Sequence, residues 1–181
     1  MNVVSPEEAL PRGIRAFTTT RAGGTSRGAF SSLNFAMHVP DERQAVASNI
    51  QNLTLARDLP HSPRWLNQVH GAHTVDAIDV QHSYTVEADA VYTDHVGVVC
   101  AVMSADCIPL VLYDIGGQEI AAVHAGWKGL LNGIIESAVR KFSTPATRIR
   151  AWIGPGISRT AYVVDADFRQ RFVRENQEFS R

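Results

Sequence analysis

The hydrophobic and polar positions of this chain fall into short apolar runs separated by polar breaks, most clearly between residues 97 and 130. Three of these runs have the character of buried strands, namely residues 98–104, 108–113 and 119–123. The first two are separated by the polar triplet Ala105-Asp106-Cys107, and the third leads into His124 and a break at Gly126. Polar side chains of these types at the ends of apolar strands usually have partners or a function. We therefore expect this edge of a sheet to carry the chemistry.

Other strands are expected where short apolar or β-branched runs end at turn-forming residues. They are residues 13–19, 64–69, 74–78, 90–93, 148–153 and 162–164. The first of these runs into Arg21-Ala22-Gly23-Gly24, whose glycines allow the backbone to approach a ligand closely. The polar segment 79–88 is predicted to be a surface loop.

Three helices are expected from apolar residues at helical spacing. One begins at Asp41 as N-cap, with Gln44 completing a capping box, and ends before Pro60. The strongest helical pattern covers residues 130–142, and Arg140 and Lys141 in its last turn suit the helix dipole. A third helix is expected to start at Asp165, with a helix-like run from Phe168 to Phe179.

The order of these elements predicts an α/β fold with a mixed β-sheet and flanking helices. The segment Ile115-Gly116-Gly117-Gln118 has the composition of a hairpin turn, whereas other connections contain helices. A length of 181 residues suits a single domain, and 45% hydrophobic and 19% charged residues are typical of a globular protein.

Charge and cysteine content exclude several classes of function. The formal net charge is −1, without a block of lysine and arginine, so nucleic acid is not an expected partner. We see neither a signal-peptide pattern nor an apolar stretch long enough to span a membrane, and we expect a cytoplasmic protein. The two cysteines, Cys100 and Cys107, lie on one strand-like segment and imply no disulfide framework.

Three potential metal ligands stand at predicted strand ends: His70, Cys107 and His124. Structural zinc sites usually show closely spaced ligand pairs, and none is present here. Widely separated ligands are typical of a site that the fold assembles. Two histidines and a thiolate with an open fourth position would suit a catalytic Zn²⁺, and copper shares the same ligand preference.

The same residues allow two interpretations without a metal. Cys107 could act as a nucleophile with His124 as its base and Asp106 or Asp89 as the group that orients the base. Backbone N–H groups at Gly126 and Gly154 would then stabilise an oxyanion. Alternatively, the glycine-rich strand ends could form a binding site for a small molecule without catalysis.

Several motifs follow one another in an order that resembles the YfiH-type family, also called the laccase-domain or peptidoglycan-editing-factor family. They are Thr20-Arg21-Ala22-Gly23-Gly24, Ser32-Leu33-Asn34, Asn67-Gln68-Val69-His70-Gly71, Ala88-Asp89-Ala90, Ala105-Asp106-Cys107-Ile108-Pro109, Val123-His124-Ala125-Gly126-Trp127-Lys128-Gly129 and Ile153-Gly154-Pro155-Gly156-Ile157. The resemblance covers nearly the whole chain. It implies a fold similar to the Cys-His hydrolase fold of the necrotizing toxins, and zinc ligands at His70, Cys107 and His124.

The resemblance also implies an activity. Family members are described as purine nucleoside phosphorylases acting on adenosine, inosine, guanosine and methylthioadenosine, with adenosine deaminase activity. Older descriptions make them copper-dependent polyphenol oxidases (laccases), and some members are linked to editing of peptidoglycan precursors, which a Cys-His hydrolase or amidase would perform. The expected partners are therefore a purine nucleoside and phosphate, with no membrane, and the expected state is a monomer or weak homodimer.

The roles that follow from this resemblance can be assigned to individual residues. Asp106 and Asp89 are the candidates for proton transfer beside Cys107 and His124. Substrate contacts are expected from Arg21, Asn34, Gln68 and Lys128, with the two cations binding phosphate. Simpler structural roles are also open. Asp106 could do no more than orient a histidine, and Gln68 and Asn34 could do no more than form hydrogen bonds with the backbone of loops.

This chain departs from the pattern of the family in one respect. Family members usually continue for several dozen residues, with a further cysteine and an aromatic-Ser-aromatic-Arg-Arg segment near the site. We therefore expect residues 1–181 to form one YfiH-like domain that lacks its C-terminal part, with an incomplete active site.

Overall fold

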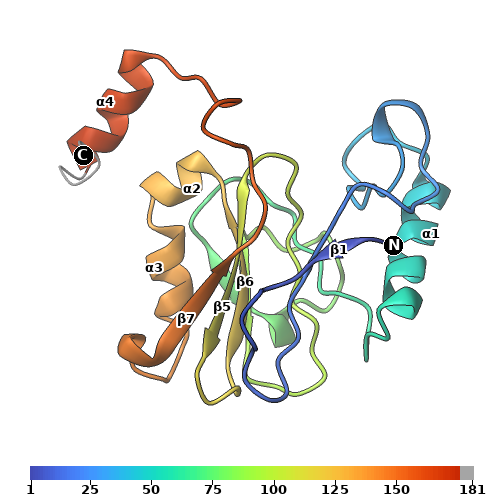
Figure 1. Ribbon diagram of the computed structural model, residues 1–181, viewed down its shortest axis with the longest axis horizontal. Helices are drawn as coiled ribbons and strands as arrows, with labels where there is room; N and C mark the ends of the chain where they lie inside the picture. Colours follow the sequence, from blue (N-terminus) through green and yellow to red (C-terminus); the bar gives the residue numbers. More distant parts are fainter. Residues whose placement is uncertain (176–181) are drawn as a thin grey trace.

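The computed structural model describes residues 1–175, and its centre is a five-stranded mixed sheet in the order β3-β4-β6-β5-β7 (Figure 1). The strands are β3 (Thr74–Asp76), β4 (Ala90–Thr93), β5 (Ile108–Asp114), β6 (Ile120–Ala125) and β7 (Ile149–Ile153). Only β3 and β4 are parallel, and the other neighbours are antiparallel. The predicted α/β class with a mixed sheet is confirmed.

The hairpin between β5 and β6 has the expected turn. Asp114 accepts hydrogen bonds from the backbone N–H groups of Gly116, Gln118 and Glu119 at 2.7–2.8 Å. Gly117 has φ +76°, a conformation that glycine adopts without a steric penalty. The turn fixes the register that later brings two candidate ligands together.

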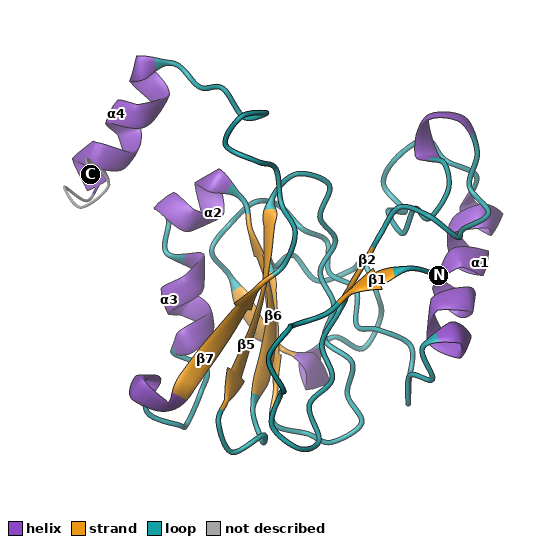
Figure 2. Cartoon of the chain, in the orientation of Figure 1, coloured by secondary structure: helices purple, strands orange, loops and turns teal. Residues whose placement is uncertain are grey.

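Helices cover one face of the sheet, and loops cover the other (Figure 2). The helical face carries α2 (Trp127–Leu131) and α3 (Ile134–Val139), which pack on side chains such as Leu112 and Val123. The expected single helix over residues 130–142 is therefore wrong, because the chain turns at Gly133, which has φ +82°. On the opposite face, Leu66, Val80 and Val91 form a second core beneath irregular segments.

Two predicted strands are wrong for the same physical reason. Residues 98–104 and 64–69 form no strand and make only isolated bridges, such as Arg64 with Cys100. Their apolar side chains, including Val98 and Leu66, instead cover the loop face of the sheet. An apolar run indicates that its side chains are buried, and buried side chains do not require the backbone to be paired in a β-sheet.

The N-terminal part also differs from expectation. Of residues 13–19 only β2 (Thr18–Thr19) is a strand, and it pairs with the unpredicted β1 (Val3–Val4). Helix α1 (Arg43–Ala56) begins after Glu42, so the expected N-cap at Asp41 is wrong. The Asp41 carboxylate instead accepts hydrogen bonds from the Asn34 amide and from the backbone N–H of Glu42.

The C-terminal part lies away from the sheet (Figure 1). Residues 162–164 are exposed and form no strand, contrary to prediction. Helix α4 (Ala166–Glu175) starts after Asp165 as expected, and the Asp165 carboxylate accepts the Phe168 N–H at 2.7 Å. The rest of the expected run to Phe179 lies outside the described residues. Short 3₁₀ turns complete the chain: η1 (Gly28–Phe30), η2 (Ala77–Asp79) and η3 (Ala146–Arg148).

Within residues 1–175, none of the helices combines the length and apolar character needed to cross a bilayer.

Candidate metal centre

The fold brings His70, Cys107 and His124 together at one end of the sheet. One potential ligand atom from each residue lies within 4.8 Å of those of the other two. The two imidazole rings meet edge to face, with centroids 4.7 Å apart. His124 is buried, Cys107 is half-buried and His70 is exposed, so the group is open to solvent on the His70 side.

The β5–β6 register places Cys107 beside His124. Ile108 pairs with Ala125, so Cys107 comes opposite Gly126 at the end of the ladder. A Cβ atom at Gly126 would lie 3.0 Å from Cδ2 of His70 and 3.2 Å from Sγ of Cys107. The missing side chain at Gly126 therefore lets the three candidate ligands approach one another.

Asp89 holds the two histidines in place. Its fully buried carboxylate accepts hydrogen bonds from the backbone N–H groups of Val69, His70 and Gly71 at 2.7–3.2 Å. It also lies 2.8 Å from Nδ1 of His124, and the His124 backbone N–H donates to the Asp89 carbonyl at 2.7 Å. When Nδ1 of His124 donates to this carboxylate, Nε2 keeps the lone pair that a metal needs.

The charged form of Asp89 is favoured by these contacts. Burial by itself raises its pKa, but the hydrogen bonds from His124, Gly71 and Val69 outweigh that effect and leave the pKa below its usual value. The same contacts fix His70 with φ +59°, a left-handed conformation that is uncommon for residues other than glycine. One buried carboxylate thus holds the His124 ring directly and holds the backbone from which the His70 side chain projects.

The surroundings of Cys107 do not activate a free thiol. Burial, followed by the negative charges of Asp106 and Asp89, raises the pKa of the Cys107 thiol. A nucleophilic cysteine needs a lowered pKa. Gly154, one of the two expected oxyanion donors, gives its N–H to the Pro109 carbonyl at 2.8 Å. The metal-free cysteine mechanism therefore lacks two of its expected supports.

The residues present fit a metal ion. Two imidazoles and a thiolate are the usual donors for Zn²⁺, and a set of three protein ligands leaves a position for a substrate. The Asp89–His124 contact is the kind of carboxylate–histidine pair that orients metal-binding histidines. The same donors suit copper, and the chemistry of the ligands does not select between the two ions.

The other candidate residues lie on different segments of the chain. Asp106 is exposed beside Cys107, and Lys128 lies in α2 with Nζ 5.6 Å from the Trp127 ring centroid. The Gln68 amide bonds both backbone groups of Met103. Arg21 instead bonds the Ser31 carbonyl.

Asn34 bonds Asp41, in the same N-terminal region as Arg21. This region lies beside α1, across the molecule from α2 (Figure 1). The contacts of Arg21 and Asn34 are with neighbouring residues of this region, and their role toward substrate stays a prediction.

Two features of the centre escape sequence reasoning. Asp89 is a candidate in the sequence both for proton transfer and for orienting His124, and its contacts fit the second role; its hold on the His70 backbone has no signal in the sequence. Gly126 was expected to matter through its N–H, whereas the space above its Cα is what the centre uses. The signal available in advance was the glycine directly after a histidine-bearing strand, in His124-Ala125-Gly126.

Known proteins match this sequence over most of its length. A Shigella flexneri protein named purine nucleoside phosphorylase YfiH is 40% identical over 171 residues, which is 94% of this chain and 70% of the relative. A Pseudomonas aeruginosa protein, also named purine nucleoside phosphorylase, is 39% identical over 97% of this chain and 70% of its own length.

Solved structures agree with the fold. The crystal structure of a Neisseria meningitidis protein of a family of unknown function (DUF152) is 35% identical and superposes with a TM-score of 0.92, over 98% of this chain and 72% of that protein. The structure of YlmD from Geobacillus stearothermophilus is 28% identical, with a TM-score of 0.77 over 94% of this chain and 71% of that protein.

The family model described as multi-copper polyphenol oxidoreductase laccase matches residues 15–181. This match confirms the YfiH-type resemblance of the motifs around His70, Cys107 and His124. The chain belongs to the multi-copper polyphenol oxidoreductase laccase family, whose relatives include proteins named purine nucleoside phosphorylase YfiH.

Proposed function

We propose that this chain binds Zn²⁺ through His70, Cys107 and His124 and catalyses the phosphorolysis of purine nucleosides. The observation that carries the proposal is the group of three potential ligand atoms within 4.8 Å of one another. The names of relatives at about 40% identity supply the substrate class. When bound, the zinc ion would supply Lewis acidity to a substrate oxygen at the open side of the centre.

The residues around the centre have distinct tasks in this proposal. Asp89 holds Nδ1 of His124 and the backbone N–H of His70, so it fixes the direction of the His124 ring and the position of the His70 backbone. Lys128 follows Gly126 by two residues and is the cation that we assign to phosphate. Phosphorolysis forms a bond from phosphate oxygen to C1′ and breaks the bond from C1′ to the purine nitrogen.

The departing purine needs a proton, which the attacking phosphate gives up, and Asp106 is the residue that we assign to relay it. Asp106 is exposed and directly precedes Cys107 in the sequence. The same group would serve adenosine deamination, where a proton must move from water to the leaving amine. Asp106 is preferred to Asp89 because the latter is fully buried and already accepts several hydrogen bonds.

Phenol oxidation is the less favoured activity. A multicopper enzyme needs ligands for several ions, and residues 1–175 contain one group of three or more clustered ligand side chains. Editing of peptidoglycan precursors by a cysteine hydrolase would depend on an activated thiol, and the surroundings of Cys107 raise its pKa.

Metal analysis combined with substitution of the ligands tests the proposal. We expect close to one zinc per purified chain, and loss of both zinc and inosine phosphorolysis in His124→Ala and Cys107→Ser. A wild-type chain without stoichiometric metal, or variants that keep full phosphorolysis, would contradict it. Survival of activity after chelation, with loss on thiol alkylation, would favour the cysteine nucleophile instead.

A further inference from the structure

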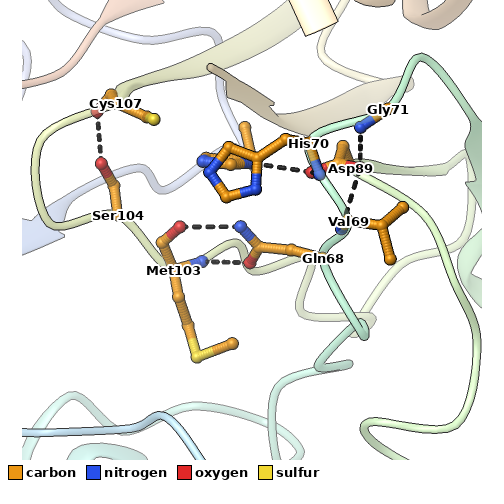
Figure 3. A network of polar contacts seen from close by, with 9 residues as sticks. Gln68, Val69, His70, Gly71, Asp89, Met103, Ser104 and Cys107 are labelled. Atoms are coloured by element: carbon orange, nitrogen blue, oxygen red, sulfur yellow. Dashed lines mark hydrogen bonds and ion pairs between the residues drawn. The ribbon is translucent and has the colours of Figure 1, made fainter. Parts of the chain in front are cut away.

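Gln68 links two of the segments that carry candidate ligands. Its Nε2 donates to the Met103 carbonyl at 2.8 Å, and its Oε1 accepts the Met103 N–H at 2.6 Å (Figure 3). Gln68 lies two residues before His70, and Met103 lies four residues before Cys107. The side chain therefore acts as a short bridge between the His70 segment and the Cys107 segment.

The segment before Cys107 needs such support because it has no strand ladder. Residues 103–107 precede β5, whose pairing with β6 begins at Ile108. Ser104 bonds the Cys107 carbonyl, but this contact stays within the segment. From outside, the Ile157 N–H holds the Asp106 carbonyl at 2.8 Å, and Gln68 holds Met103.

The other pairings of ligands have their own connections. Asp89 joins His70 to His124, and the β5–β6 register joins His124 to Cys107. The direct link between His70 and Cys107 runs through the half-buried Gln68 amide. Loss of this link would leave His124 oriented and Asp106 bonded to Ile157, but Met103 would lose its attachment to the residues just before His70.

We propose that Gln68 is a positioning residue that sets the distance between His70 and Cys107 and so tunes the affinity of the metal centre. This inference rests on the zinc site of the proposed function. It gives Gln68 a role in holding ligands in place of the substrate contact expected from the sequence. Groups that orient metal ligands typically change metal affinity by about 10- to 100-fold when they are removed.

The test uses Gln68→Met, which keeps the length of the side chain and removes both hydrogen bonds. The matched control is Gln81→Met, since Gln81 is exposed in the loop after η2. Zinc affinity is measured by competition with a chromophoric chelator, and Co²⁺ replaces zinc to report the thiolate through its near-ultraviolet charge-transfer absorption. Thermal unfolding without metal shows whether each variant folds.

We expect Gln68→Met to bind zinc about 10- to 100-fold more weakly and to lose cobalt–thiolate absorption, with Gln81→Met unchanged. Equal affinity and an equal cobalt spectrum in Gln68→Met and the wild type would overturn the positioning role while leaving the zinc site intact. A wild-type chain that binds no zinc would overturn the proposed function itself, and the positioning role with it.

If Gln68→Met does not fold, Gln68→Glu decides the question. Its carboxylate still accepts the Met103 N–H but faces the Met103 carbonyl without a proton to donate, so one of the two bonds is lost. We expect weaker zinc binding and weaker cobalt–thiolate absorption than in the wild type. Wild-type values for both measurements would overturn the proposal.

Discussion

The two ends of the β4–β6 pair each contain a buried carboxylate, and the two carboxylates have different uses. Asp89, at the ligand end, is 0% exposed, and Glu119, at the opposite end, is 4% exposed. Glu119 accepts the Tyr92 hydroxyl at 2.6 Å and the backbone N–H groups of Ser143 and Thr144 at 2.7 and 3.0 Å. Both groups therefore accept several hydrogen bonds that favour the ionised form.

The difference lies in what the donors are attached to. The Tyr92 ring packs against Phe142, with centroids 5.2 Å apart, so the Glu119 network ends inside the apolar core. The Asp89 network ends at His124 and His70, beside a half-buried thiol. Burial and a lowered pKa are thus common to both carboxylates, and only the partners separate a structural group from one that organises a site.

The largest effect is expected from Asp89→Asn. The amide cannot accept all of the bonds from Val69, His70, Gly71 and His124, and it loses the charge that orients His124. We expect a loss of about 3–5 kcal/mol in the free energy of unfolding, because a buried charge-assisted network is broken. Zinc affinity should also fall by about 10- to 100-fold. Denaturant unfolding and zinc titration measure the two losses, and unchanged zinc affinity would remove Asp89 from the centre.

Glu119→Gln should lower the free energy of unfolding and leave zinc affinity unchanged. Hydrogen bonding outweighs burial and lowers the Glu119 pKa from 4.5 to about 2. A lowered pKa means that this stabilisation is present above pH 4.5 and is lost as the pH falls toward 2. We expect the variant to be about 3 kcal/mol less stable than the wild type at pH 7, with the difference closing near pH 2.

Unfolding by denaturant at several pH values checks the Glu119 prediction, and zinc titration at pH 7 is its control. A stability difference that stays constant between pH 7 and pH 2 would show that the Glu119 charge is not involved. Weaker zinc binding in Glu119→Gln would contradict the separation of the two ends.

Gly126→Ala should have the smallest effect on stability but should still lower zinc affinity. The added Cβ would lie 3.0 Å from Cδ2 of His70 and 3.2 Å from Sγ of Cys107, so these side chains must move by a few tenths of an ångström. We expect about 1 kcal/mol of lost stability and about tenfold weaker zinc binding. Gly28→Ala, in η1, is the comparison variant: its added Cβ would meet no atom within 4 Å, and zinc affinity should stay unchanged.

The sequence predicts best the segments in which buried side chains and backbone pairing in the sheet occur together. Residues 90–93 are all buried and residues 109–113 are buried or half-buried, and both segments are strands. Residues 98–104 are equally apolar but act as a cover, which a one-dimensional pattern cannot distinguish from a strand. Gly133 breaks a helical pattern that the apolar spacing alone makes continuous.

The three candidate ligands could be named from their chemistry, and Asp89 could be named as a group that orients His124, but the remaining contacts of Asp89 and those of Gln68 could not be predicted. His70, Cys107 and His124 stand out because soft or imidazole ligands end apolar runs. The contacts of Asp89 depend on three consecutive N–H groups that turn inward around a left-handed His70. Those of Gln68 depend on a loop 35 residues away along the chain. Neither arrangement leaves a periodic trace in the sequence.

The exposure of His70 has a consequence for how an ion would enter and leave. His124 lies in a strand paired on both sides, and its buried ring is held by Asp89, so its position is fixed. His70 lies in a loop and is reached from solvent, so it can swing away while the sheet stays closed. Exchange of a bound ion would therefore begin with movement of the His70 side chain, the most exposed of the three candidate ligands.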